Sequence, residues 1–430
     1  MDILTPDRTS IAASYRAVAA VFVVLCLFPW VSFGLLDLDT QPWFIFAALV
    51  FCALSIRIRA DTVVLSSALM LAAAAVLCGI TRMRAPDLLL LRGILSYTGF
   101  SAVLLGYYYY RRQFGFPWST FIVANVIWLL VGLIQTFTNP RVFSAFVVVR
   151  TTADRGVTGL SPEPTFYGLV LLLLSWIFLV ESDYRPSQRL RLLLFVNVAF
   201  IMLVAKSAMA MALVLLLLLG YVILGATRLR GFIYVCGFLV LVLIAASIVY
   251  ERYPDWRVFR IITALVENPL LAIKADASVN ERFAHLVFSF YGAVINNGIP
   301  GGFHTFSEFN SLARAAYGGL FWFGEDTDKI MSGIGAVVYE LGWFSLIFFA
   351  LVAFCALSRD RWRISIFHLI GFLGLFSSAL SVAFPLVPIF LVTMLFWRRS
   401  LPKNRTHRIS SYNPIRLDGN FRDVTGLKVR

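Results

Sequence analysis

The sequence predicts an all-α, polytopic integral membrane protein with about twelve transmembrane helices and one large external loop. A helix needs about 20 apolar residues to cross a membrane, and about twelve runs of that order occur along the chain. Of its 430 residues, 60% are hydrophobic, 15% are aromatic and only 14% are charged. That composition is typical of a chain that lies mostly in lipid. We expect one transmembrane domain over residues 1–430.

The apolar runs are separated by polar or charged breaks. A single helix over 190–224 would bury Lys206 at a cost of several kcal/mol, so two helices with a tight turn at Lys206 and Ser207 are expected. Pro385 and Pro388 favour a broken last helix. Residues 1–15 are too polar for a signal peptide, so the first span is expected to be retained. The expected spans are 17–36, 43–56, 63–80, 88–108, 118–137, 165–180, 190–205, 208–224, 232–249, 334–357, 364–376 and 379–396.

Basic residues in the connections predict the orientation, since cytoplasmic loops accumulate Lys and Arg. With both termini in the cytoplasm, the short arginine-bearing connections and a basic tail at 398–430 all lie inside. The net charge of +14 then follows largely from topology. A nucleic-acid partner is not indicated, because the basic residues are scattered over short loops and a tail that we expect to contact membrane lipid.

The same orientation places two long segments outside, at 138–164 and 250–330. Connections of this length usually carry structure or chemistry. In the second segment, apolar residues of 278–294 recur at helical spacing, and the stretch from Asn296 to Gly302 ends that helix.

Several polar residues have a structural interpretation. Asn125, Gln135 and Asn197 lie within expected spans and predict hydrogen bonds between helices. Glu340 lies inside the membrane near its outer face, where a carboxylate is expected to be paired or hydrogen-bonded as structural glue. The five cysteines fall in expected spans, and the four histidines have no paired spacing. We therefore expect no disulfide framework, metal site or cofactor.

Four short motifs occur in order along the chain. They are Glu163-Pro-Thr-Phe-Tyr-Gly168, Ala205-Lys206-Ser207-Ala208, Ser278-Val-Asn-Glu-Arg282 and Tyr339-Glu340-Leu341-Gly342-Trp343. With the expected topology, the region from Gly132 to Trp397 resembles the superfamily of Wzy polysaccharide polymerases and O-antigen ligases, which are bacterial inner-membrane glycosyltransferases.

Two departures from that superfamily bear on function. Its ligases usually carry a histidine shortly before the Glu-Leu-Gly motif, and the stretch from Asp328 to Ser332 has none, which favours a polymerase. The family's Ser-Arg turn lacks its arginine here, and Lys206 before the serine is the nearest cation. The second departure leaves the role of the turn open.

The resemblance implies that a sugar hydroxyl attacks a polyprenyl-diphosphate-linked glycan on the periplasmic face, extending O-antigen, capsule or exopolysaccharide. A chain-length regulator and a flippase are the further partners it implies. Fixed cations would meet the leaving diphosphate, and arginine binds phosphate through two parallel hydrogen bonds, so no metal is required. The expected clamp is Arg282 with Arg155, Arg150 and Lys206, and Arg314 is a weaker candidate. Interfacial arginines reaching for lipid headgroups are the structural alternative.

A general base would assist by accepting the proton of the acceptor hydroxyl. Glu163, fixed between Pro162 and Pro164, is the first candidate, and a simple ion pair with Arg155 is its alternative. His304 is the second candidate, with a solvated loop histidine as its alternative.

Three other functions fit parts of the sequence. An O-antigen ligase would share most of the motifs. Asp37 and Asp39 in the first external connection suit a glycosyltransferase that uses polyprenyl-phosphate sugars. A lipid-linked glycan flippase or secondary transporter would need internal repeats and broken helices at the midplane, and only the last helix meets that requirement.

Overall fold

The computed structural model describes residues 8–32, 40–81, 88–151, 156–225, 257–324, 329–358, 360–378 and 380–399, with single positions between 233 and 252. The described residues form helices and no strands, which confirms the all-α class. The helices are α1 (Arg8–Leu27), α2 (Trp43–Leu54), α3 (Thr62–Thr81), α4 (Leu88–Phe114), α5 (Trp118–Phe137), α6 (Pro164–Glu181), α7 (Gln188–Phe200), α8 (Ala208–Gly225), α10 (Arg257–Glu267), α11 (Pro269–Ala275), α12 (Ala277–Ile295), α13 (Phe306–Ala316), α14 (Gly333–Leu341), α15 (Ser345–Ala356), α16 (Trp362–Ser378) and α17 (Leu386–Arg399).

Six helical segments of the described residues are long and apolar enough to cross a membrane. They are Thr62–Thr81, Leu90–Phe114, Trp118–Phe137, Pro164–Glu181, Gln188–Ala205 and Gly333–Ala356. Four shorter apolar helices lie at Ala13–Leu27, Trp43–Leu54, Ala208–Gly220 and Trp362–Ser377. The expected span at 232–249 lies mostly outside the described residues, as does the tail at 400–430. The expectation of twelve spans therefore stays a prediction, whereas a helical membrane protein is supported.

Prolines explain where two expected spans were wrong at their ends. The first was expected to continue to residue 36, but α1 ends at Leu27, because Pro29 disfavours helical geometry at the preceding residue and cannot donate a backbone hydrogen bond. The last was expected from residue 379, but α17 begins at Leu386, directly after Pro385. The break between α16 and α17 confirms the interruption predicted from the prolines.

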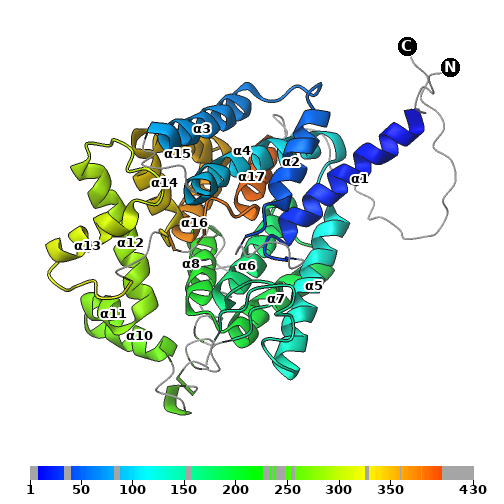
Figure 1. Ribbon diagram of the computed structural model, residues 1–430. Helices are drawn as coiled ribbons and strands as arrows, with labels where there is room; N and C mark the ends of the chain where they lie inside the picture. The colour runs from blue at the N-terminus through cyan, green and yellow to red at the C-terminus, as the bar shows by residue number, and fades with distance from the viewer. Residues whose placement is uncertain are drawn as a thin grey trace.

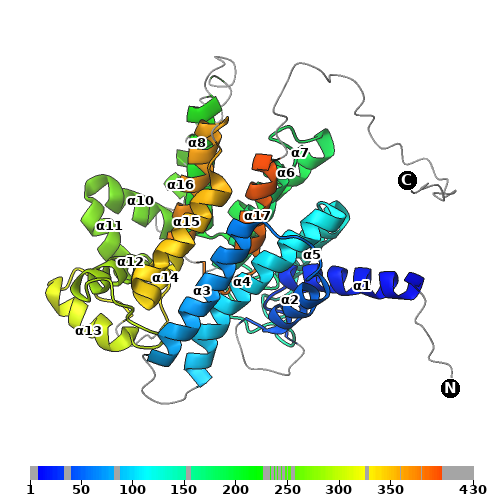
Figure 2. The same cartoon turned by 90° about the horizontal axis from the view of Figure 1, so that it is seen from above.

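The helices form a bundle with a lateral group of shorter helices. Helices α6 and α17 lie in contact near its centre, and most residues of both are buried. Helices α10 to α13 form the lateral group, opposite α1 and α5, and α12 packs against α14 of the bundle (Figure 1, Figure 2). These helices confirm that the described part of the 250–330 segment is helical.

Polar contacts cross-link the bundle where water would be absent. Asn125 of α5 and Asn197 of α7 exchange two hydrogen bonds of 2.9 and 2.8 Å, and Asn197 also donates to Ser175 of α6 at 2.8 Å. Tyr97 of α4 donates to Glu340 of α14 at 2.6 Å. These bonds confirm the structural interpretation of Asn125, Asn197 and Glu340, because each satisfies a buried polar group that lipid could not.

Ion pairs gather the connections that were expected to be cytoplasmic. Arg111 of α4 lies 2.5 Å from Glu181 of α6. Arg361 pairs with Asp183, and Arg399 pairs with Asp61. Since these residues come from five separate parts of the chain, the basic connections meet at one end of the bundle.

We predict that Asn125→Ala lowers the free energy of unfolding in detergent by about 1 to 2 kcal/mol, because the buried Asn197 amide loses both hydrogen bonds to Asn125 and keeps only Ser175 as a partner. A double-mutant cycle with Asn197→Ala measures the pairing directly, and the double variant should lose less than the sum of the single variants. Gln188→Ala removes an exposed amide and is the control. Strict additivity of Asn125→Ala and Asn197→Ala would contradict the pairing.

Candidate functional site

The turn between α7 and α8 forms one wall of the candidate site. Helix α7 widens into a π-helical segment at Ile201–Ala205, and Lys206 then adopts a left-handed conformation with φ of 48°. The Ser207 hydroxyl accepts a hydrogen bond from the Ala210 amide at 3.3 Å and starts α8. The turn leaves Lys206 exposed, which confirms the two-helix prediction for 190–224.

The loop before α6 rests on this turn. The Val157 amide donates to the Val204 carbonyl at 3.2 Å. A Cβ atom at Gly156 would lie 2.1 Å from the Ala205 carbonyl oxygen, so only glycine permits this approach. The Gln135 side chain holds the loop from α5 by accepting from the Gly159 amide at 2.7 Å and donating to its carbonyl at 3.1 Å. Gln135 was expected to bond between helices, and this was wrong: its side chain instead links α5 to the loop, at Pro140, Thr158 and Gly159.

The same loop brings the backbone of Arg150 next to that of Glu163. Glu163 is half-buried at the N-cap of α6, yet its side chain makes no capping hydrogen bond. The Arg150 amide donates to the Pro162 carbonyl at 2.7 Å, so Arg150 lies across the loop from Glu163, with an exposed side chain. Arg155, Asp37 and Asp39 lie outside the described residues.

Helix α12 contributes Arg282, which contacts the residues that follow the turn. Asp276 caps the helix by accepting from the Val279 amide at 3.0 Å, as a short acidic side chain does at a helix start. The Arg282 guanidinium Nη1 then lies 2.7 Å from the Met209 Sδ, in the first turn of α8. Arg282 and Lys206 therefore lie at the same helix start, although 76 positions separate them in the sequence (282 − 206).

Glu281 is a site residue that the sequence analysis did not single out. Burial raises the pKa of its carboxyl, Glu163 raises it further, and the cations Arg282, Arg314 and Lys329 oppose the rise. Two carboxylates from segments far apart in the sequence therefore share one electrostatic environment with several cations. Its position next to Arg282 in the sequence was the available signal. The sequence could not indicate that Glu163, which is distant along the chain, lies near Glu281.

Arg314 holds the segment at 323–324, which lies against Glu281. It is buried, its Nη2 donates to the carbonyls of Phe323 and Gly324, and its guanidinium lies over the Phe288 ring. The Glu281 carboxylate in turn packs against Gly324. Arg314 thus fixes the segment that Glu281 touches, and these contacts occupy one side of the guanidinium with protein groups.

The two histidines of this region have different environments. His304 is half-buried in a turn with φ of 55°, beside Thr305, whose hydroxyl lies 3.4 Å from that of Tyr339. His285 is fully buried, and its Nδ1 accepts from the Met331 amide at 2.9 Å, which leaves the proton on Nε2. Burial, with Arg314 and Arg282 nearby, lowers the pKa of His285 to about 3. His285 is therefore neutral near pH 7 and contacts the segment in which the sequence lacks a histidine.

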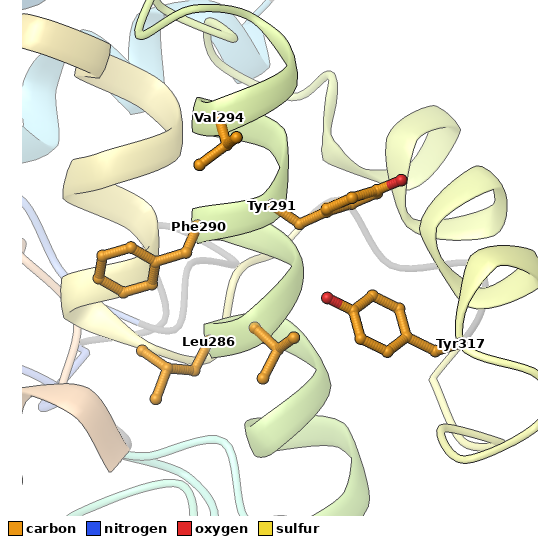
Figure 3. A pocket seen from close by; sticks show the side chains of 6 residues that line it. Leu286, Phe290, Tyr291, Val294 and Tyr317 are labelled. Atoms are coloured by element: carbon orange, nitrogen blue, oxygen red, sulfur yellow. The ribbon is translucent and has the colours of Figure 1, made fainter.

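An apolar groove begins one helical turn after Arg282. It has a volume of about 420 Å³ and opens to the outside (Figure 3). Leu286 and Phe290 point to one side of α12, whereas Tyr291 faces Tyr317 on the other (Figure 3). Val287 and Val294 complete the lining. A cation followed by an apolar groove is an arrangement that suits an amphiphile with an anionic head.

Cations and carboxylates are the charged groups among the described residues of the site. Among them, no group of three or more His, Cys, Asp or Glu side chains is arranged to hold a metal ion. Arg282, Lys206 and Lys329 can bind an anion, and Glu163 and Glu281 can accept a proton. This set of groups suits acid–base chemistry on a substrate that carries negative charge.

We predict that His285→Asn makes the protein less sensitive to acid. In the wild type, the unfolded histidine takes up a proton below its ordinary pKa of about 6.5, whereas the folded one does so only near pH 3. Stability is therefore complete above about pH 6.5 and falls as the pH drops toward 3. Between pH 7 and pH 5 the wild type should lose about 2 kcal/mol more than the variant, measured by unfolding in detergent. Parallel pH profiles would contradict this burial.

We predict that Gly156→Ala destabilises the protein by about 1 to 3 kcal/mol, because the new Cβ meets a backbone carbonyl that cannot yield. Gly374→Ala is the matched control, since the nearest atom to its added Cβ is 3.5 Å away. Thermal unfolding in detergent compares the two. Equal stability of both variants would show that the loop does not rest on the turn.

Comparison of the chain with protein-family models, with curated proteins and with solved structures found no match.

Proposed function

We propose that the chain is a membrane glycosyltransferase that joins polyprenyl-diphosphate-linked oligosaccharide repeats into O-antigen, capsule or exopolysaccharide on the periplasmic face of a bacterial inner membrane. The observation that carries the proposal is the meeting of three separate segments: the loop at 156–163, the turn at Lys206 and the start of α12. Three of the four sequence motifs that resemble those of Wzy-type polymerases include residues of these segments, and the fourth, Tyr339 to Trp343, lies at the end of α14. The convergence of the three segments is what one shared substrate would require.

In the proposed reaction, an acceptor hydroxyl oxygen forms a bond to the anomeric carbon of the donor glycan. The bond between that carbon and the diphosphate oxygen breaks, and its electron pair leaves with the polyprenyl diphosphate. Arg282 and Lys206 stabilise the growing negative charge, and Arg150 and Arg155 are further members of the clamp. A preorganised cation or donor of this kind lowers a barrier by about 3 kcal/mol.

The acceptor proton passes to a carboxylate. Glu163 is our first candidate, because its side chain does not cap its own helix, and His304 remains the second candidate. Glu281 lies in the same electrostatic environment, where burial and the nearby Glu163 carboxylate raise the pKa of the Glu281 carboxyl. In this proposal Arg314 positions the 323–324 segment, so its part in diphosphate binding is indirect.

The groove on α12 provides a place for the first prenyl units of the lipid carrier. It starts at Leu286, one turn after Arg282, and its lining is apolar. A diphosphate bound at Arg282 would lie about one helical turn from the first residue of this groove. The gathering of basic connections at the opposite end of the bundle supports an orientation in which both termini are cytoplasmic.

The test of function uses purified full-length protein, candidate polyprenyl-diphosphate oligosaccharides from the host, and EDTA in half of the reactions. A product ladder spaced by one repeat, with and without EDTA, supports a metal-independent polymerase. A single added unit indicates a ligase. Loss of activity with EDTA favours the glycosyltransferase that uses Asp37 and Asp39, and unchanged substrate favours a transporter.

We predict that Arg282→Ala reduces polymer formation at least about 100-fold, because the leaving diphosphate loses its main cation. Arg282→Lys should also fail, since an ammonium group cannot form the two parallel bonds that guanidinium makes with phosphate. Arg191→Ala removes an exposed arginine of α7 and serves as the control. Protein abundance is measured alongside the product ladder, and full activity of Arg282→Ala at normal abundance would exclude the clamp.

A further inference from the structure

Helix α10 exposes a wide apolar face. Ile262, Leu265 and Val266 are 50%, 54% and 81% exposed, and Leu270 at the start of α11 is 54% exposed. At 100° per residue these α10 side chains fall on one half of the helix, and Arg260, Thr263 and Glu267 fall on the other. A strip of this kind in water is unfavourable, so it calls for an apolar partner.

The contacts of α10 show where that partner lies. The Phe259 ring packs edge-on against Tyr250 with centroids 5.3 Å apart, and Tyr250 directly follows the expected span at 232–249. Along that span, Val240, Ile244 and Ile248 recur every fourth residue and are 54%, 54% and 61% exposed. A helix face of this composition is lipid-facing in a membrane protein. The exposed face of α10 therefore begins where a lipid-facing surface ends.

We propose that α10 lies in the plane of the membrane–water interface on the expected external face, with Ile262, Leu265 and Val266 inserted at the boundary between headgroups and acyl chains. The partner is the phospholipid bilayer itself. The polar half carries both Arg260 and Glu267, so insertion depends on the apolar face and does not require anionic lipid. This inference rests on the membrane character of the chain and is independent of the proposed reaction.

The consequence concerns the height of the candidate site above the membrane. Helix α10 packs against α11, and α11 packs against α12, which carries Glu281 and Arg282 (Figure 1). Insertion of α10 in the membrane interface would therefore hold the start of α12 at a constant distance from the lipid surface. A substrate whose reactive group sits at the headgroup level would meet the site at that distance.

The test places an environment-sensitive fluorophore on each half of α10 in the full-length protein. Val266→Cys and Ile262→Cys probe the apolar half, and Thr263→Cys is the matched control on the polar half. Each variant is labelled with a nitrobenzoxadiazole thiol reagent and reconstituted into phosphatidylcholine vesicles, and identically treated wild type supplies the background from native cysteines.

We expect the labels at Val266 and Ile262 to be blue-shifted and quenched several-fold more by lipids spin-labelled near the headgroup than the label at Thr263. Iodide in the water should quench the label at Thr263 instead. Equal iodide quenching at all three positions would overturn the proposal, because α10 would then lie in water. Shielding of Val266 from both quenchers would also overturn it, since a protein surface, such as a second copy, would then cover the face.

Discussion

The hydrogen bond from the Val157 amide to the Val204 carbonyl is the interaction on which the candidate site depends. The helix that contains Val204 has to end before Lys206, because continuing it would bury an ammonium group in lipid. Ending a helix leaves carbonyl groups without partners, and an apolar surrounding makes that costly. The loop that enters α6 supplies an amide to one of them. Because Glu163 belongs to the same loop, this hydrogen bond also holds Glu163 near the turn.

Glycine makes the approach possible, and the neighbouring helices make it stable. The loop reaches the Ala205 carbonyl at Gly156, where a side chain would collide, and Gln135 holds its far side through Gly159. Helix α12 closes the site through Arg282 and Met209. The site is thus assembled from connections, whereas the spans provide the rigid frame that keeps those connections in place.

Charge is distributed over the molecule in two different ways. At the end that bears the basic connections, arginines pair with Glu181, Asp183 and Asp61, so that helix ends are tied to one another. At the candidate site, cations and carboxylates from separate segments are grouped, and burial and Glu163 both raise the pKa of Glu281. Burying charges of both signs is costly, so such a group suits the chemistry that we propose.

The sequence by itself determined the helical membrane class, the break at Lys206, the interruption near Pro385, the helix from Ala277 to Ile295 and the bonding roles of Asn125 and Asn197. Each of these follows from a local property: hydropathy, a charge within an apolar run, a proline, or helical spacing. Only the tertiary structure brought Glu281 near Glu163, placed His285 against Met331 and turned Arg314 toward the 323–324 carbonyls. These contacts depend on how distant segments pack, and packing is decided by many weak interactions summed over the whole bundle, which no local pattern contains.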